Sequence, residues 1–223
     1  MSLILEGRLS DSPYVEMIWR GQAGKDCYPI CPADSRWNMH MLRENGKTRV
    51  AVEGAMTKAI PLSHSEGAEW LTIKFKVGVF VPHLSTSNML NGRVVLPEAA
   101  RKSYWLYSST WQFPDYDDVE IFVARLIKQG LLARDPVVEA ALLDQPQPLS
   151  VRSMRRHFLR ATGLTRSYIR QIERAQHAVS RLEKGDSILD VAYEAGYSDQ
   201  SHMTRALKHL MGRTPAQIVP INK

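Results

Sequence analysis

Residues 194–215, EAGYSDQSHMTRALKHLMGRTP, decide the fold of the last third of the chain. A glycine-containing turn is followed there by a polar cluster and then by apolar residues spaced three and four apart. This spacing predicts a helix over about residues 198–211 that begins at Ser198, a favoured N-cap type. Its inward face holds Met203, Leu207 and Leu210, with Met211 near the same face. Its outward face holds Ser201, Arg205, Lys208 and His209, with His202 on the flank.

A shorter helix is predicted immediately before this one. The stretch SILDVAYEAGYS at residues 187–198 has apolar residues at helical spacing, and Gly196 ends it in a turn. A short helix, a glycine-containing turn and a second helix with a polar outer face form a helix-turn-helix unit. The second helix of such a unit lies in the major groove of DNA and points its N-terminal residues towards the base edges.

A second copy of the groove helix is predicted 48 residues earlier, over about residues 150–162. Ser150 is a good N-cap, and Gly163 stops the helix. Apolar residues share one face, at Met154, Phe158 and Ala161, and arginines share the other, at Arg152, Arg156 and Arg160. Prolines at 146 and 148 interrupt the helix that precedes this copy, so the first unit is expected to be atypical.

A longer helix is predicted between the two units, over residues 167–184. At about 1.5 Å per residue it would be near 27 Å long. Three arginines point mostly outward from it and are expected to form a solvated face: Arg170, Arg174 and Arg181.

The excess positive charge of the chain lies in its last third. Residues 145–223 hold 13 Lys and Arg against 6 Asp and Glu, whereas residues 1–144 hold 16 against 17. A near-neutral front joined to a basic back is typical of a sensing domain attached to a nucleic-acid-binding domain. A basic solvated surface is the other interpretation.

We expect no targeting segment in this sequence. The apolar run in MSLILEGRLS is too short for a signal peptide, and the most apolar segment, residues 70–84, contains Lys74 and Lys76. We therefore expect a cytoplasmic protein without a membrane partner. Cys27 and Cys31 cannot close a tetrahedral zinc site and are expected to be free thiols in a reducing compartment.

The front of the chain is predicted to be rich in short antiparallel strands. Near-alternating runs are separated by turn residues, and Asn45-Gly46 between two of them is a strong hairpin signal, because a type I′ turn needs positive φ at both central residues. After Pro114 the pattern becomes helical, with Val119, Phe122, Leu126 and Leu131 on one stripe. We predict a β-rich domain over 1–112, a helical connection over 113–147 and an all-α domain over 148–223.

Residues 149–219 resemble the DNA-binding domain of AraC-type transcriptional regulators. The matching stretches are LSVRSMRRHFLRATG and ILDVAYEAGYSDQSHMTRALKHLMGRTPAQIV. The front part more loosely resembles the β-rich sensor domains attached to such domains, in a divergent group with a Pro-Ala-Asp segment before an apolar strand, here Pro32-Ala33-Asp34. The resemblance implies an α+β protein: an N-terminal antiparallel β-barrel-like, cupin-like domain followed by an all-α domain with two helix-turn-helix units.

The resemblance also implies roles for individual residues and partners. Base-facing positions are Arg152, Arg155, Arg156, Ser201, His202 and Arg205. Phosphate contacts are Arg160, Arg166, Lys208 and Thr214. Double-stranded DNA is the expected partner, and a small-molecule effector, RNA polymerase and a second copy of the chain are further candidates. No catalytic residue, metal or cofactor is expected.

The front domain leaves three interpretations open. In the first, a barrel encloses a small ligand, with Trp37, His40, Trp70 and Phe75 as lining residues or as ordinary core. In the second, it is a cupin-like metal-dependent enzyme, although His40, His64 and His83 are scattered and no His-x-His pair is present. In the third, the chain is a ligand-independent DNA-binding dimer that pairs through the helices at 117–144.

Overall fold

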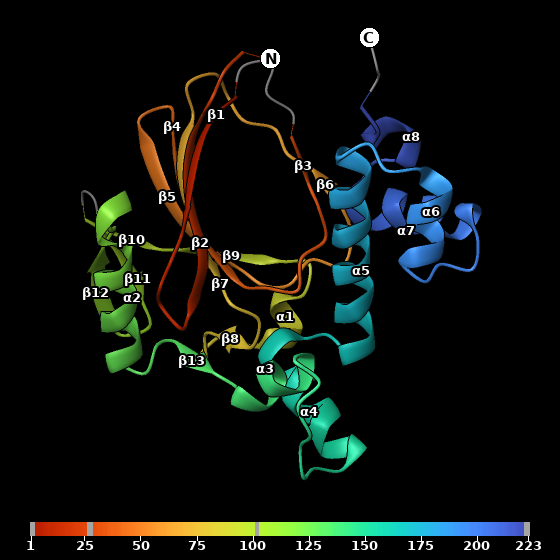
Figure 1. Cartoon of the computed structure of the whole chain (residues 1–223). Coiled ribbons are helices and arrows are strands. Elements are labelled where there is room, and N and C mark those ends of the chain that lie inside the picture. The colour runs from red at the N-terminus through yellow and green to blue at the C-terminus, as the bar shows by residue number, and fades with distance from the viewer. Residues whose placement is uncertain (1–2, 26–28, 101–102, 221–223) are drawn as a thin grey trace.

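The computed structural model describes residues 3–25, 29–100 and 103–220. Its front part is built on a six-stranded antiparallel sheet of order β1-β2-β7-β4-β5-β9 (Figure 1). The strands, in sheet order, are β1 Leu3–Leu9, β2 Val15–Ala23, β7 Glu69–Phe75, β4 Asn38–Glu44, β5 Lys47–Glu53 and β9 Arg93–Leu96.

Three small sheets accompany the large one. They pair β10 Glu98–Ala100, β11 Ser103–Leu106 and β12 Ser109–Gln112; β8 Val79–Phe80 with β13 Ala133–Arg134; and β3 Ile30–Cys31 with β6 Ile60–Pro61. The helices are α1 Thr86–Met89, a 3₁₀ turn Tyr116–Asp118, α2 Val119–Lys128, α3 Pro136–Leu142, α4 Val151–Thr162, α5 Arg166–Glu183, α6 Ile188–Glu194, α7 Gln200–Met211 and α8 Pro215–Ile218.

The expected α+β class is confirmed, with one difference in the sheet. Among the described strands β1 and β9 are edges and do not pair with each other, so the sheet stays open and no barrel closes. Closure would need a staggered pairing between the two edge strands. Instead, β9 is only four residues long, and the chain continues from it into the separate β10–β12 sheet.

The hairpin signal at Asn45-Gly46 is confirmed. Both residues have positive φ, 51° and 74°, and they join β4 to β5 through the pair Glu44–Lys47. The register of this hairpin was therefore predictable from two residues.

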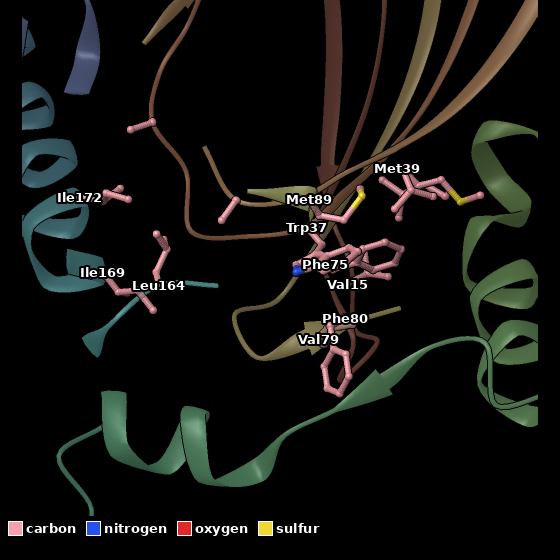
Figure 2. Packing of buried hydrophobic residues seen from close by; sticks show 14 of the residues in the cluster. Val15, Trp37, Met39, Phe75, Val79, Phe80, Met89, Leu164, Ile169 and Ile172 are labelled. Atoms are coloured by element: carbon pink, nitrogen blue, oxygen red, sulfur yellow. The ribbon is translucent and has the colours of Figure 1, made fainter. Parts of the chain in front are cut away.

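One hydrophobic cluster joins the front of the chain to its helical end. It includes Trp37, just before β4, and Phe75 of β7, together with Phe158 of α4, Ile169 of α5 and Met203 of α7. Figure 2 shows Trp37 and Phe75 at the end of the sheet, with Ile169 and Ile172 on α5 beside it. The predicted domain boundaries at 112/113 and 147/148 stay predictions.

The expectation that both cysteines are free thiols can be compared with the structure only at Cys31, because Cys27 lies outside the described residues. Cys31 is free, and burial raises the pKa of its thiol to about 11, so it is protonated at neutral pH. In the described ranges, no helix combines the length and the apolar character that crossing a membrane requires.

Glu120 of α2 ties this helix to the first strand of the sheet. Its carboxylate accepts hydrogen bonds from both terminal nitrogens of Arg8 and, at 2.8 Å, from the hydroxyl of Ser10. The guanidinium of Arg8 lowers the pKa of Glu120 from 4.5 to about 2. The ionised carboxylate therefore stabilises the fold above pH 4.5, and this contribution is lost as the pH falls towards 2.

We predict that Glu120→Gln lowers the free energy of unfolding at pH 7 by about 1 kcal/mol, after allowance for solvent screening. Urea unfolding at pH 7 and pH 3 should show the difference from wild type shrinking at pH 3. Glu6→Gln is the matched control, because its partner Arg20 is exposed. An undiminished difference at pH 3 would contradict this account.

Candidate DNA interface

The second helix-turn-helix unit consists of α6, a turn at Gly196 and α7. The N-cap of α7 is Asp199, whose carboxylate accepts the backbone N–H of His202 at 2.7 Å. This hydrogen bond lowers the pKa of Asp199, so the cap is charged at neutral pH. The prediction of Ser198 as the cap was wrong by one residue, because its hydroxyl instead lies 3.1 Å from Nδ1 of His202.

The first unit consists of α3 and α4, and here the predicted N-cap is confirmed. The hydroxyl of Ser150 accepts the backbone N–H of Ser153 at 3.1 Å. The expected interruption of the preceding helix was wrong. The helix α3 ends at Leu142, before the two prolines, which lie instead in the turn over residues 143–150. The first unit therefore differs from the second in the length of its turn.

The helices α4 and α7, which the sequence predicts to be the two recognition helices, repeat with a period of 49 residues. Their N-caps are Ser150 and Asp199, and both end at a glycine, Gly163 and Gly212, with φ 74° and ψ −2°. The period corrects by one the spacing expected from the sequence. Under it, buried Phe158 corresponds to buried Leu207, and exposed Arg156 corresponds to exposed Arg205.

All six residues predicted to face bases are exposed: Arg152, Arg155, Arg156, Ser201, His202 and Arg205. Within the described ranges, none of the four arginines forms an ion pair within 4 Å of a carboxylate, although the charge of Arg205 acts on the nearby carboxylate of Asp199. One ring nitrogen of His202, Nδ1, already has a hydrogen-bond partner, the hydroxyl of Ser198.

The arginines of α5 have partners within the protein, so they do not form the solvated face that was expected. The side chain of Arg166 pairs with Asp144, and Arg170 pairs with the same carboxylate at 2.9 Å. The side chain of Arg181 binds Asp186 and Glu194. The guanidinium of Arg174 lies 5.5 Å from the ring centre of Tyr197. These arginines therefore hold the helices together.

The four residues predicted to contact phosphates are divided by the same criterion. Arg160 pairs with Asp135 at 3.0 Å, and Arg166 with Asp144 as above, so both already have a carboxylate partner. Lys208 is exposed and lies 3.4 Å from the carbonyl of Gly212. Thr214 forms a capping box at the start of α8. Of the four, only Lys208 combines exposure with a charge that no described carboxylate neutralises.

Asp135 is a structural residue of this interface that sequence reasoning missed. Its side chain is 1% exposed, accepts the N–H of Val137 as the N-cap of α3, and faces Nδ1 of His157 at 2.8 Å. It also binds Arg160, so it joins α3 to α4. The signal was present, because Asp followed by Pro is a favoured start of a helix.

The four residues considered as ligand-lining do not converge. Trp37 and Phe75 are fully buried in the core, which agrees with the packing interpretation. His40 places Nδ1 2.9 Å from the hydroxyl of Thr72, and Trp70 stacks on His64. Of the four, only Trp70 borders a groove of about 930 Å³, which is lined by residues of the large sheet and of the segment 112–116, among them Arg20, Arg43, Phe113 and Tyr116.

The three histidines weighed for a cupin-like metal site lie apart. His40 is beside Thr72, His64 stacks on Trp70 and His83 stacks on Tyr107. In the ranges that the structure describes, no group of three or more potential metal-ligating side chains comes together.

Comparison with known proteins bears on the helical part. Residues 148–219 match a family model described as a helix-turn-helix domain. This region is an AraC-type helix-turn-helix domain. Helix-turn-helix domains are DNA-binding modules. No curated protein matches the sequence.

Solved structures similar to the whole chain are those of ToxT from Vibrio cholerae. One at 1.65 Å resolution has 9% identity, a TM-score of 0.45, and coverage of 97% of each chain. Another, with unsaturated fatty acid bound, has 12% identity, a TM-score of 0.37, and coverage of 100% of this chain and 97% of that one. The AraC-type domain itself is defined by the family match.

We predict that Asp199→Ala lowers the midpoint of thermal and urea unfolding, because the N–H groups at the start of α7 lose their acceptor. Asp199→Ser should retain most of the stability, since serine is also a good cap. Thermal and urea unfolding of the two variants provide the comparison. Equal losses in both variants would show that the cap is not the cause.

Proposed function

We propose that this chain regulates transcription by sequence-specific DNA binding, with α4 and α7 in two successive major grooves. The observation that carries this proposal is the division of its arginines. Arg152, Arg155, Arg156 and Arg205 on the outer faces of α4 and α7 have no described carboxylate partner within 4 Å. Three of the four arginines on α5, and Arg160 at the junction with α3, do have one. Arginines without such a partner on two equivalent helices are suited to base edges and phosphates.

The arrangement of the helices supports binding of both units to one side of the duplex. The connecting helix α5 has 18 residues, which gives about 27 Å at 1.5 Å per residue. In Figure 1, α4 lies beyond the lower end of α5, and α6 and α7 lie beside its upper half. With the radii of the two helices added, this length agrees with the roughly 34 Å between successive major grooves.

The division of labour that we propose follows the sequence. Residues 1–112 form a sensor domain, 113–147 a helical connection and 148–223 the DNA-binding domain. The groove of about 930 Å³ on the sheet has the volume of a small-ligand site, which favours a small-molecule effector. Contacts with RNA polymerase and pairing of two copies stay predictions.

We expect Arg205→Ala to cost about 1–3 kcal/mol of DNA-binding free energy and to relax the preference at one base pair. Arg156→Ala should do the same at a base pair in the other half of the site, because the two residues are equivalent. Lys208→Ala should instead weaken specific and scrambled sites alike, as a phosphate contact does. The specific site is obtained by selecting bound sequences from a random DNA pool, and the affinities are measured by binding titrations.

Lys128→Ala is the matched control for these variants, because it removes one exposed positive charge from α2. If it weakened binding as much as Arg205→Ala, the effect would be one of net charge. Specific recognition by α7 would then be rejected.

A footprint on the selected site should protect two major grooves about 34 Å apart on one face of the duplex. Arg156→Ala should weaken protection in one groove and Arg205→Ala in the other. Protection confined to a single groove in the wild-type protein would contradict the two-groove arrangement.

A further inference from the structure

The C-terminal ends of both recognition helices are bound by the front domain. An α-helix leaves its last four carbonyl groups without partners inside the helix. At the end of α7, the carbonyl of His209 accepts the backbone N–H of Ala59 at 3.0 Å. The next carbonyl, of Leu210, accepts the backbone N–H of Ala33 at 2.7 Å.

The end of α4 is bound in the same way. The carbonyl of Arg160 accepts the hydroxyl of Thr86 at 2.6 Å. The next carbonyl, of Ala161, accepts the indole N–H of Trp37 at 3.0 Å, in a buried contact. All four donors come from the first 100 residues of the chain.

The 49-residue repeat makes these contacts equivalent. Arg160 corresponds to His209 and Ala161 to Leu210, so the front domain binds the same two carbonyls at the end of each helix. The closing glycines also face it. A Cβ added at Gly163 would lie 3.3 Å from Thr86, and one added at Gly212 would lie 2.6 Å from Ile30.

One short segment contacts both recognition helices. Ala33 binds the end of α7 and Trp37, four residues later, binds the end of α4. Between them, Asp34 is fixed to the front domain by backbone hydrogen bonds to Met56 in both directions and by its carboxylate to Lys74. Ala33 and Trp37 are both fully buried.

We propose that the segment Pro32–Trp37, together with Ala59 and Thr86, sets the relative position of α4 and α7 and so determines which spacing of the two DNA half-sites the protein prefers. These are positioning residues, which act through the helices that they hold. The helix α5 by itself leaves freedom at the turns on either side of it. A second, rigid connection between the far ends of the recognition helices removes that freedom. The proposal rests on the proposed function, in which both helices bind DNA.

The test is Trp37→Phe, which keeps most of the aromatic volume and removes the N–H that Ala161 accepts. The probes are the duplex selected by the wild-type chain, the same duplex with its spacer changed by one or two base pairs, and duplexes holding one half-site. We expect the preference for the selected spacing to fall roughly five- to tenfold, because a buried carbonyl loses its donor. Affinity for single half-sites should stay at the wild-type value.

Two further variants keep the test decisive. Thr86→Val removes the hydroxyl that binds Arg160 with little change in shape, and it should shift the spacing preference in the same way even if Trp37→Phe unfolds. Trp105→Phe alters an exposed tryptophan in β11 of the front domain and should change nothing. Thermal unfolding of each variant identifies the folded ones.

The outcomes separate this proposal from the proposed function. If folded Thr86→Val and Trp37→Phe keep the wild-type spacing preference, or lose affinity equally for half-sites and full sites, the positioning role is overturned. If Arg156→Ala or Arg205→Ala leaves DNA binding unchanged, the two-groove function fails, whatever the spacing data show.

Discussion

The hydrogen bond from the indole of Trp37 to the carbonyl of Ala161 is the interaction on which the arrangement of the two parts depends. Both groups are buried, and a buried carbonyl without a donor costs about 1–3 kcal/mol. The end of α4 therefore cannot leave the front domain without exposing the indole or leaving both groups unpaired. The same constraint acts at α7 through Ala33. The large hydrophobic cluster of the described residues likewise spans both parts.

Ion pairs divide the arginines of the helical part into two groups, those with a carboxylate partner and those without one. The connection between the two parts supplies the carboxylates of Asp135 and Asp144, which pair with Arg160, Arg166 and Arg170. Those arginines therefore form ion pairs between helices and the connecting segment. The remaining arginines of α4 and α7 keep their full charge on the outer face. The basic residues of the last third are thus of two kinds: those paired with carboxylates inside the protein, and those whose charge stays available for a partner such as DNA.

Local features of the chain were predictable from sequence because they depend on neighbouring residues. The turn at Asn45-Gly46, the cap at Ser150 and the closing glycine Gly163 all follow from backbone preferences within a few positions. The misplaced cap at Ser198 was a local error, since serine and aspartate cap helices almost equally well. The prolines before Ser150 were misjudged because a pattern of residues does not show where a helix has already ended.

The sequence by itself determined that the front is rich in strands and the back helical, where α4 begins and ends, where α7 lies to within one residue, and that the last third resembles an AraC-type domain. Only the tertiary structure decided that the sheet stays open, that Trp37 serves the helical part, and which arginines are left without carboxylates. The physical reason is separation along the chain. Trp37 and Ala161 are 124 positions apart, and Thr86 and Arg160 are 74 apart. Their contacts arise from packing between elements, and no period or motif in the sequence records them.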